Sequence, residues 1–213
     1  MTNQLLVIAK APIPGRVKTR LCPPCTPRQA ARLAAASLAD TLTAVLATPA
    51  TRRILVLAGV LRRAPAGVHL VPQRGNGLAD RLAAAFADTA LPGAASFLVG
   101  MDTPQLSVQL LTTALRRLAA ADAVLGPAVD GGWWGLGLRD PRHAVALRDV
   151  PMSTAETGAR TLAALTARGL EVALLPTLRD VDTIADAVAV APLAPRSQFA
   201  AALARLHPGA EAR

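Results

Sequence analysis

Short apolar segments alternate with longer segments of helical periodicity along almost the whole chain, and this alternation limits the fold more than any other feature. Such alternation is typical of a mainly parallel sheet covered by helices on both faces. We therefore predict a single-domain α/β protein with three layers, helices on each side of a Rossmann-like sheet. The segments expected as strands are residues 4–9, 54–58, 68–71, 96–99, 123–125, 133–138 and 172–175.

Several helix boundaries carry their own signals. Thr26 followed by Pro27 is typical of a helix start, and a long apolar spacing follows it. Ser153 with Glu156 three residues later matches a capping box, so a helix is expected from there until Gly169 ends it. Further helices are expected over residues 78–90 and 107–120, and two short ones after the last strand.

Length and composition favour one domain. The chain has 213 residues, 52% of them hydrophobic, and no linker or change of composition divides it. We expect a domain over residues 1–206 and a frayed tail over 207–213. The first residues lack the basic and apolar regions of a signal peptide, and Arg, Asp and Pro interrupt the Ala-rich runs. A cytoplasmic protein without a membrane span is therefore expected.

The chain is strongly basic, with a formal net charge of +9. A positive field favours anionic partners, either nucleic acid or phosphorylated small molecules. The arginines are scattered, however, aromatic residues make up 2% of the chain, and Tyr is absent, so platforms for stacking bases are scarce. These features argue against nucleic acid and favour a polyphosphate ligand.

The most informative segment is residues 10–21, KAPIPGRVKTRL, which follows a strand and precedes a helix. In α/β sheets this is the position of the ligand crevice. Gly15 permits a close approach of the backbone, and the loop carries cations and exposed N–H groups that suit phosphates. It is not a Walker A loop, because the second glycine of that pattern is missing. Lys10 and Lys18 are the only lysines of the chain, which otherwise uses Arg for its cations.

Aspartates follow two of the predicted strands. Asp102 comes directly after the strand at residues 96–99, where a carboxylate would point into the crevice and could hold Mg²⁺ beside phosphate oxygens. It could instead be the N-cap of the next helix. Asp180 and Asp182 follow the last strand, and either could complete the metal site with Asp102. Alternatively, Asp182 or Thr183 simply caps a terminal helix.

The chain's two tryptophans follow two adjacent glycines in the segment DGGWW, residues 130–134. Gly131 and Gly132 would let a ligand approach the backbone, and a Trp face is suited to a sugar or a base. The alternative is a hairpin turn with a Trp in the core. Because neighbours on a strand point to opposite faces, we expect one Trp at the ligand and one in the core.

Other reactive side chains form no recognisable pattern. Cys22 and Cys25 are spaced as C-P-P-C, but they do not follow a strand as a redox pair would, so two incidental thiols are expected. The histidines are far apart in sequence, and His69 is expected to be packed in a buried strand. No G-x-S-x-G motif is present, which disfavours covalent hydrolysis.

The segments KAPIPGRVKTRL, GMDTPQL, DGGWWGLGL and DVDT, in this order, resemble a bacterial family of unknown function. That family is grouped with GT-A glycosyltransferases of the nucleotide-diphospho-sugar transferase superfamily, beside molybdenum-cofactor nucleotidyltransferases and phospholactate guanylyltransferases. The resemblance implies the GT-A fold, with Asp102 as metal ligand and Asp180 or Asp182 as its distant partner. It also implies a set of nucleotide-binding residues: Lys10, Ala11, Pro12, Gly15, Lys18, Thr19, Arg20, Gln73, Gly75, Leu78 and Arg81.

The expected function is transfer of a glycosyl group from a nucleotide-sugar, with Mg²⁺ or Mn²⁺ as cofactor. Lys18 and Asp102 would be catalytic, Asp130 is the candidate general base, and Gly131, Gly132 and Trp133 would contact the acceptor. The alternative is nucleotidyl transfer from a nucleoside triphosphate to a phosphorylated small molecule, which the absence of a full D-x-D motif favours. Two further alternatives are a nucleotide-binding module without activity and a nucleic-acid-binding protein.

Overall fold

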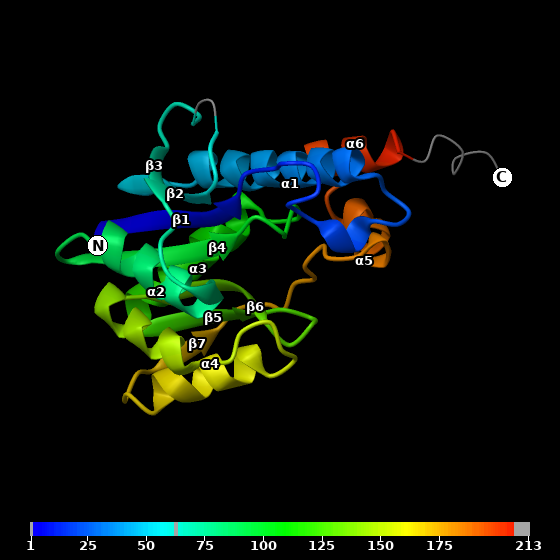
Figure 1. Cartoon of the computed structure of the whole chain (residues 1–213). Coiled ribbons are helices and arrows are strands. Elements are labelled where there is room, and N and C mark those ends of the chain that lie inside the picture. Colours follow the sequence, from blue (N-terminus) through cyan, green and yellow to red (C-terminus); the bar gives the residue numbers. More distant parts are fainter. Residues whose placement is uncertain (1, 62–63, 207–213) are drawn as a thin grey trace.

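The structure, a computed structural model, describes residues 2–61 and 64–206. Its centre is a seven-stranded sheet with the order β3-β2-β1-β4-β6-β5-β7 (Figure 1). Strands β3, β2, β1 and β4 are parallel, β6 is antiparallel to both β4 and β5, and β7 is parallel to β5. The predicted mainly parallel α/β sheet is therefore confirmed. The strands are β1 (Thr2–Lys10), β2 (Arg52–Ala58), β3 (His69–Pro72), β4 (Ala94–Gly100), β5 (Ala123–Pro127), β6 (Trp133–Leu138) and β7 (Val172–Leu174).

Strand β3 differs from the expectation of a buried strand. It lies at the edge of the sheet and pairs with β2 alone. His69 and Leu70 are consequently exposed, and the prediction that His69 is packed was wrong. An apolar run of four residues does not reveal whether a strand is central or at an edge.

Helices begin close to most of the predicted positions. Thr26 caps α1 through a capping box with Gln29, and Ser107 caps α3 by accepting a hydrogen bond from Leu110 N. The 3₁₀ helix η2 was not predicted, since its irregular turns lack an apolar period of 3.6. The helices are α1 (Pro27–Ala47), α2 (Gly77–Thr89), α3 (Val108–Ala120), α4 (Thr157–Thr166), α5 (Ile184–Val190) and α6 (Gln198–Ala204), with 3₁₀ helices η1 (Thr19–Leu21), η2 (Pro141–Asp149) and η3 (Ala191–Leu193).

The predicted capping box at Ser153 was wrong. Helix α4 begins at Thr157, and Ser153 has a left-handed backbone with φ of 61°. The side chain of Thr157 closes this turn instead, because its Oγ1 accepts a hydrogen bond from Thr154 N at 3.1 Å. Gly169, with φ of 76°, follows the helix as expected.

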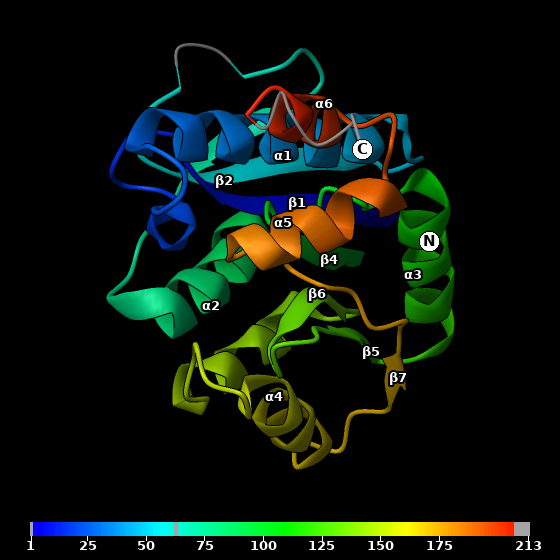
Figure 2. The same cartoon turned by 90° about the vertical axis from the view of Figure 1, so that its right-hand side faces the viewer.

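Helices cover both faces of the sheet and leave its carboxyl edge for a ligand. Leu5 and Val7 of β1 pack on the side of α1 and α3, and Leu6 packs on the side of α2, α4 and η2, where Phe86 is fully buried. This two-sided burial is why β1 is apolar at successive positions. A further cluster joins η1 to the C-terminal helices through Leu21 and Phe199. Cys25 is buried and Cys22 half-buried there, both as free thiols. Helix α6 lies beside α1 (Figure 2).

Helix α1 is long and apolar enough to cross a membrane by length and composition, with a mean hydropathy of 1.3 over its most apolar window. About 61% of that window is buried inside the protein, as in the core helix of an α/β domain. The expected absence of a membrane span and the cytoplasmic location stay predictions. The expected tail over 207–213 lies outside the described residues.

Candidate active site

A cavity of about 630 Å³ opens at the carboxyl ends of β1 and β4, the position typical of ligand crevices in α/β sheets. Most of the predicted site residues line it, although they come from five separate stretches of the chain. These are Lys10, Lys18, Thr19, Arg20, Gln73, Leu78, Arg81, Asp102, Asp130, Gly132, Trp133, Asp180 and Asp182. Ala11, Pro12, Gly15, Gly75 and Gly131, also predicted, do not line the cavity.

Lys18 forms the centre of the site. It has a left-handed backbone at the start of η1, with φ of 50°, and its side chain is 8% exposed. Its Nζ lies 2.9 Å from Oδ1 of Asp102 and 2.8 Å from Oδ1 of Asp182. Burial lowers the pKa of the Lys18 ammonium, but the two carboxylates outweigh this effect and hold the pKa above its usual value. Lys18 is therefore a protonated bridge between distant acidic segments.

Asp102 lies on the turn that follows β4. Its carbonyl oxygen accepts a hydrogen bond from Val181 N at 2.9 Å, which ties this turn to the segment carrying Asp182. Ser37 of α1 donates to the carbonyl of Met101 at 2.6 Å and supports the same turn from below. The alternative role of Asp102 as an N-cap is wrong, because Ser107 caps α3.

Asp182 and Asp180 have different surroundings. Asp182 also pairs with Arg20 at 3.2 Å. Because Thr183 is the N-cap of α5, Asp182 does not cap that helix, and its carboxylate faces the cavity residues instead. Burial, with the charges of Asp102 and Asp130, raises the pKa of Asp180 to about 7. Its Oδ1 is buried and has no hydrogen-bond partner among the described residues.

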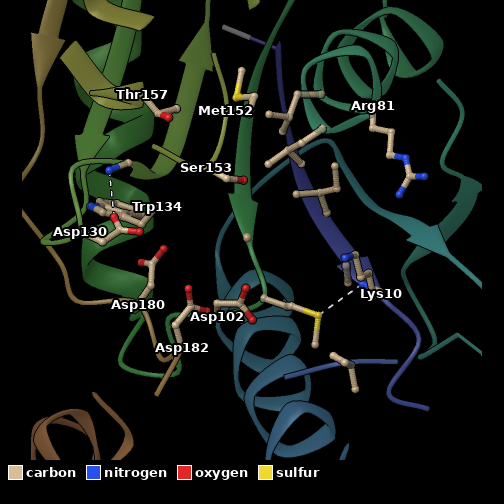
Figure 3. A pocket seen from close by; sticks show the side chains of 18 of the residues that line it. Lys10, Arg81, Asp102, Asp130, Trp134, Met152, Ser153, Thr157, Asp180 and Asp182 are labelled. Carbon is tan, nitrogen blue, oxygen red and sulfur yellow. Dashed lines mark hydrogen bonds between the residues drawn. The ribbon is translucent and has the colours of Figure 1, made fainter. Parts of the chain in front are cut away.

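Residues 73–81 contribute both to the cavity and to the packing around it. Gln73 lines the cavity, but its side-chain amide donates to the carbonyls of Ala9 and Val56 at 2.8 and 3.0 Å and holds β1 and β2 together. Gly75 has φ of 118° and forms the turn before α2, and its carbonyl accepts a hydrogen bond from Arg81. Arg81 itself lines the cavity, on the same side as Lys10 (Figure 3).

Trp134 lies in the core, as predicted for one of the two tryptophans, although both tryptophans line the cavity. Trp134 is 2% exposed, packs edge-to-face on Phe97 with ring centres 6.0 Å apart, and donates to the carbonyl of Pro176 at 2.9 Å. Trp133 is half-buried, lines the cavity and donates to Thr161 Oγ1 at 3.2 Å. Gly132 N donates to Asp130 Oδ1 at 2.9 Å and thereby fixes that carboxylate.

Gly131 has a structural reason to be glycine. Its φ is 87°, its carbonyl accepts a hydrogen bond from Gly158 N at 2.8 Å, and a Cβ there would overlap the carbonyl of Ala155. Gly131 thus allows the DGGWW turn to pack against the start of α4, and its predicted contact with an acceptor stays a prediction.

Sequence reasoning missed the part of the wall that precedes α4. Met152, Ser153, Thr154 and Thr157 line the cavity. Figure 3 shows Thr157 on the side away from Lys10. The signal was present, since Ser and Thr cluster there, but it matched a capping box and was interpreted as one.

The donor set fits a hard divalent cation. Carboxylate oxygens are the ligands that Mg²⁺ and Mn²⁺ prefer, and Asp102 and Asp182 bring two carboxylates to the same lysine nitrogen inside the cavity. Within residues 2–61 and 64–206, no three His, Cys, Asp or Glu side chains are grouped closely enough to hold an ion by themselves. A cation here would therefore complete its shell with water and phosphate oxygens.

Solved structures share this architecture. A protein from Desulfovibrio desulfuricans G20, provisionally named a nucleotide-diphospho-sugar transferase, has a TM-score of 0.85 and 27% identity over 98% of this chain and 96% of that chain. The 2-C-methyl-D-erythritol 4-phosphate cytidylyltransferase of Thermus thermophilus has a TM-score of 0.56 and 18% identity over 92% of this chain and 100% of that chain. Rv0371c from Mycobacterium tuberculosis H37Rv, in complex with manganese, has a TM-score of 0.53 and 22% identity over 89% of this chain and 98% of that chain. A comparison with curated proteins gave no match.

The sheet and its cavity thus define a protein with the nucleotide-diphospho-sugar transferase fold. Residues 30–154 match the family described as "Uncharacterized protein conserved in bacteria (DUF2064)", and the chain belongs to that family. The resemblance predicted from the motifs is confirmed. The basic loop and the DVDT segment lie outside the matched range, so the structure is what joins them to it.

Proposed function

We propose that this protein is a divalent-metal-dependent transferase that uses a nucleotide-activated donor and transfers the glycosyl group of a nucleotide-sugar. One observation carries the proposal: Lys18 Nζ contacts both Asp102 and Asp182 inside the cavity, although Lys18 and Asp182 are 164 residues apart in sequence. A basic loop and acidic segments therefore meet at one edge of the sheet, as a metal-bound diphosphate requires.

The side chains have distinct roles in this proposal. Lys10, Lys18 and Arg20 bind the donor's phosphates, and Asp102 with Asp182 holds the cation. The cation, when bound, stabilises the negative charge that develops on the departing diphosphate. Charge-assisted hydrogen bonds from Lys18 and Arg20 act on the same charge.

The proposed glycosyl transfer is a nucleophilic substitution at the anomeric carbon of the donor sugar. The oxygen of an acceptor hydroxyl bonds to the anomeric carbon, and the bond from that carbon to the phosphate oxygen breaks, with its electron pair leaving on the nucleoside diphosphate. The hydroxyl proton passes to Asp130, which Gly132 N orients within the cavity.

Nucleotidyl transfer is the second candidate, and one sequence feature favours it. Gly100 stands two residues before Asp102, where a D-x-D motif would have a second carboxylate for a sugar donor. The same cations would then hold a triphosphate, and pyrophosphate would leave.

One assay tests both candidates. The protein is incubated with Mn²⁺ and either a nucleotide-sugar panel or nucleoside triphosphates, and released nucleoside diphosphate or pyrophosphate is measured. Glycosyl transfer releases nucleoside diphosphate, nucleotidyl transfer releases pyrophosphate, and Asp102→Asn should abolish either. Release of neither product with any donor contradicts both candidates.

A further inference from the structure

The cavity is electrically divided between its two walls. Its cations all come from the first 81 residues: Lys10, Arg16, Lys18, Arg20 and Arg81. Its carboxylates all come from residues 102–182: Asp102, Asp130, Asp180 and Asp182. Figure 3 shows Lys10 and Arg81 on one side and Asp130 and Asp180 on the other.

Ion pairs in the middle of the cavity neutralise part of its charge and leave unpaired charges on its two sides. Lys18 and Arg20 are paired with Asp102 and Asp182. Among the charged groups that the structure describes, Lys10, Arg16 and Arg81 form no ion pair on the basic side, and Asp130 and Asp180 form none on the acidic side. The basic side can therefore bind an anionic group, whereas the unpaired carboxylate of Asp130 on the acidic side repels one.

No basic side chain of the described residues lines the acidic side, which otherwise carries hydroxyl, thioether and indole groups. The arginines of neighbouring elements are used elsewhere: Arg148 pairs with Asp80, Arg160 with Glu156 and Arg179 with Asp186. None of these three arginines lines the cavity.

Two further features of the acidic side indicate that it binds a polar ligand. Thr103 is 1% exposed and lines the cavity, and its Oγ1 has no hydrogen-bond partner among the described residues. A buried hydroxyl without a partner is costly, and a ligand hydroxyl would satisfy it. Trp133 is held by Thr161 through its indole N–H, so its ring is oriented beside the cavity for a sugar-like or apolar group.

We propose that the acidic side, formed by Thr103, Asp130, Trp133, Ser153 and Asp180, is the acceptor subsite and takes an uncharged or cationic acceptor that carries a hydroxyl group. It discriminates against phosphorylated and other anionic acceptors. The proposal rests on the proposed function, since it assigns the basic side to the donor's diphosphate. It also separates the two candidate reactions. Nucleotidyl transfer was proposed to use a phosphorylated acceptor, and the acidic side has no basic side chain to bind the phosphate group of such an acceptor.

The test compares acceptors that differ only in a phosphate group. With donor and Mn²⁺ saturating, the rate of nucleoside diphosphate release is measured for sugars and their 6-phosphates, and for glycerol and glycerol 3-phosphate. Neutral members should react at least about tenfold faster than their phosphorylated partners, because the added charge faces the unpaired carboxylate of Asp130 and no basic side chain on that side. Faster reaction of a phosphorylated member, or no neutral member above the rate with water, overturns the proposal.

A pair of variants tests the charge itself. Ser153→Lys adds a cation to the acidic side, and Ser153→Gln adds similar bulk without charge. Ser153→Lys should reduce the preference for neutral acceptors by about tenfold relative to Ser153→Gln. Equal preferences in the two variants overturn the proposal.

Nucleotide binding is measured in parallel by thermal shift with nucleoside diphosphate and Mn²⁺. If the unaltered protein shows no thermal shift with nucleoside diphosphate and Mn²⁺, the proposed function itself is refuted. Retained binding with a preference for phosphorylated acceptors would refute the acceptor assignment alone.

Discussion

The ammonium nitrogen of Lys18 lies 2.9 Å from Oδ1 of Asp102. Asp182 accepts from the same nitrogen at 2.8 Å, so the lysine neutralises the two carboxylates that the proposed function assigns to a divalent cation. A lysine and a cation cannot occupy the space between these oxygens together. When the metal and nucleotide bind, Lys18 is expected to move from the carboxylates to the phosphates.

The first prediction concerns Lys18→Met, which keeps much of the side-chain volume and removes the charge. Affinity for Mn²⁺ alone should rise at least about threefold, because a competing cation is gone. Affinity for nucleotide in the presence of Mn²⁺ should fall about tenfold or more, because a charge-assisted contact to phosphate is lost. Electron paramagnetic resonance of free Mn²⁺ and calorimetry with nucleotide measure the two effects.

Lys10→Met is the matched control, since Lys10 is the other lysine of the chain and lines the same cavity without pairing to a described carboxylate. It should weaken nucleotide binding without strengthening Mn²⁺ binding. Equal effects of the two variants on Mn²⁺ alone would contradict the competition between Lys18 and the cation.

Much of this site was predictable because α/β sheets bring the carboxyl ends of their parallel strands to one edge. Lys10 and Asp102 each follow a strand that the sequence predicts as buried, so their convergence follows from topology alone. For Lys18 and Asp182, the sequence predicts only that both residues lie near the same cavity, and not that their side chains are in contact. Their pairing depends on how η1 packs on the C-terminal helices, which no local pattern specifies.

The details that the sequence does not reveal have a common physical origin. Ser153 matched a capping box, but the turn is closed by the side chain of Thr157, a competition between two local hydrogen bonds that the sequence does not decide. Gln73 lines the cavity, but the sequence does not reveal that its amide also donates to the carbonyls of two strands. In both cases the partner is set by tertiary packing.

A second prediction concerns Asp102→Asn. The substitution preserves shape but removes one of the two carboxylates proposed for the cation, so kcat should fall at least about a hundredfold. Mn²⁺-dependent nucleotide binding should fall with it. Asp130→Asn is the comparison: it should lower kcat through loss of the proton acceptor and retain nucleotide binding with Mn²⁺. Loss of binding in Asp130→Asn would contradict this division of roles.

Asp180 makes stability depend on pH. Its pKa of about 7 in the folded protein exceeds that of a free aspartate, so the folded state holds a proton that the unfolded state releases above about pH 4. Stability of the metal-free protein should therefore fall as pH rises from about 4 to about 7, by about 2–3 kcal/mol after allowance for partial exposure. Urea unfolding in a chelator measures this.

Asp180→Asn should remove that slope, raising stability at pH 8 and leaving it nearly unchanged at pH 4. Asp149→Asn, at an exposed position outside the cavity, serves as the control. A pH dependence that persists in Asp180→Asn would show that another group is responsible.

The last prediction separates the neighbouring tryptophans. Trp134→Ala empties a fully packed position and leaves the carbonyl of Pro176 without its donor, so the free energy of unfolding should fall by about 3–5 kcal/mol. Trp133→Ala removes a half-buried side chain whose principal proposed role is at the acceptor. It should cost about 1–2 kcal/mol and raise the KM for the acceptor while donor binding is retained. Urea unfolding and transfer kinetics on both variants check this. If Trp133→Ala destabilises the protein as much as Trp134→Ala and leaves the acceptor KM unchanged, Trp133 belongs to the core and has no part in the site.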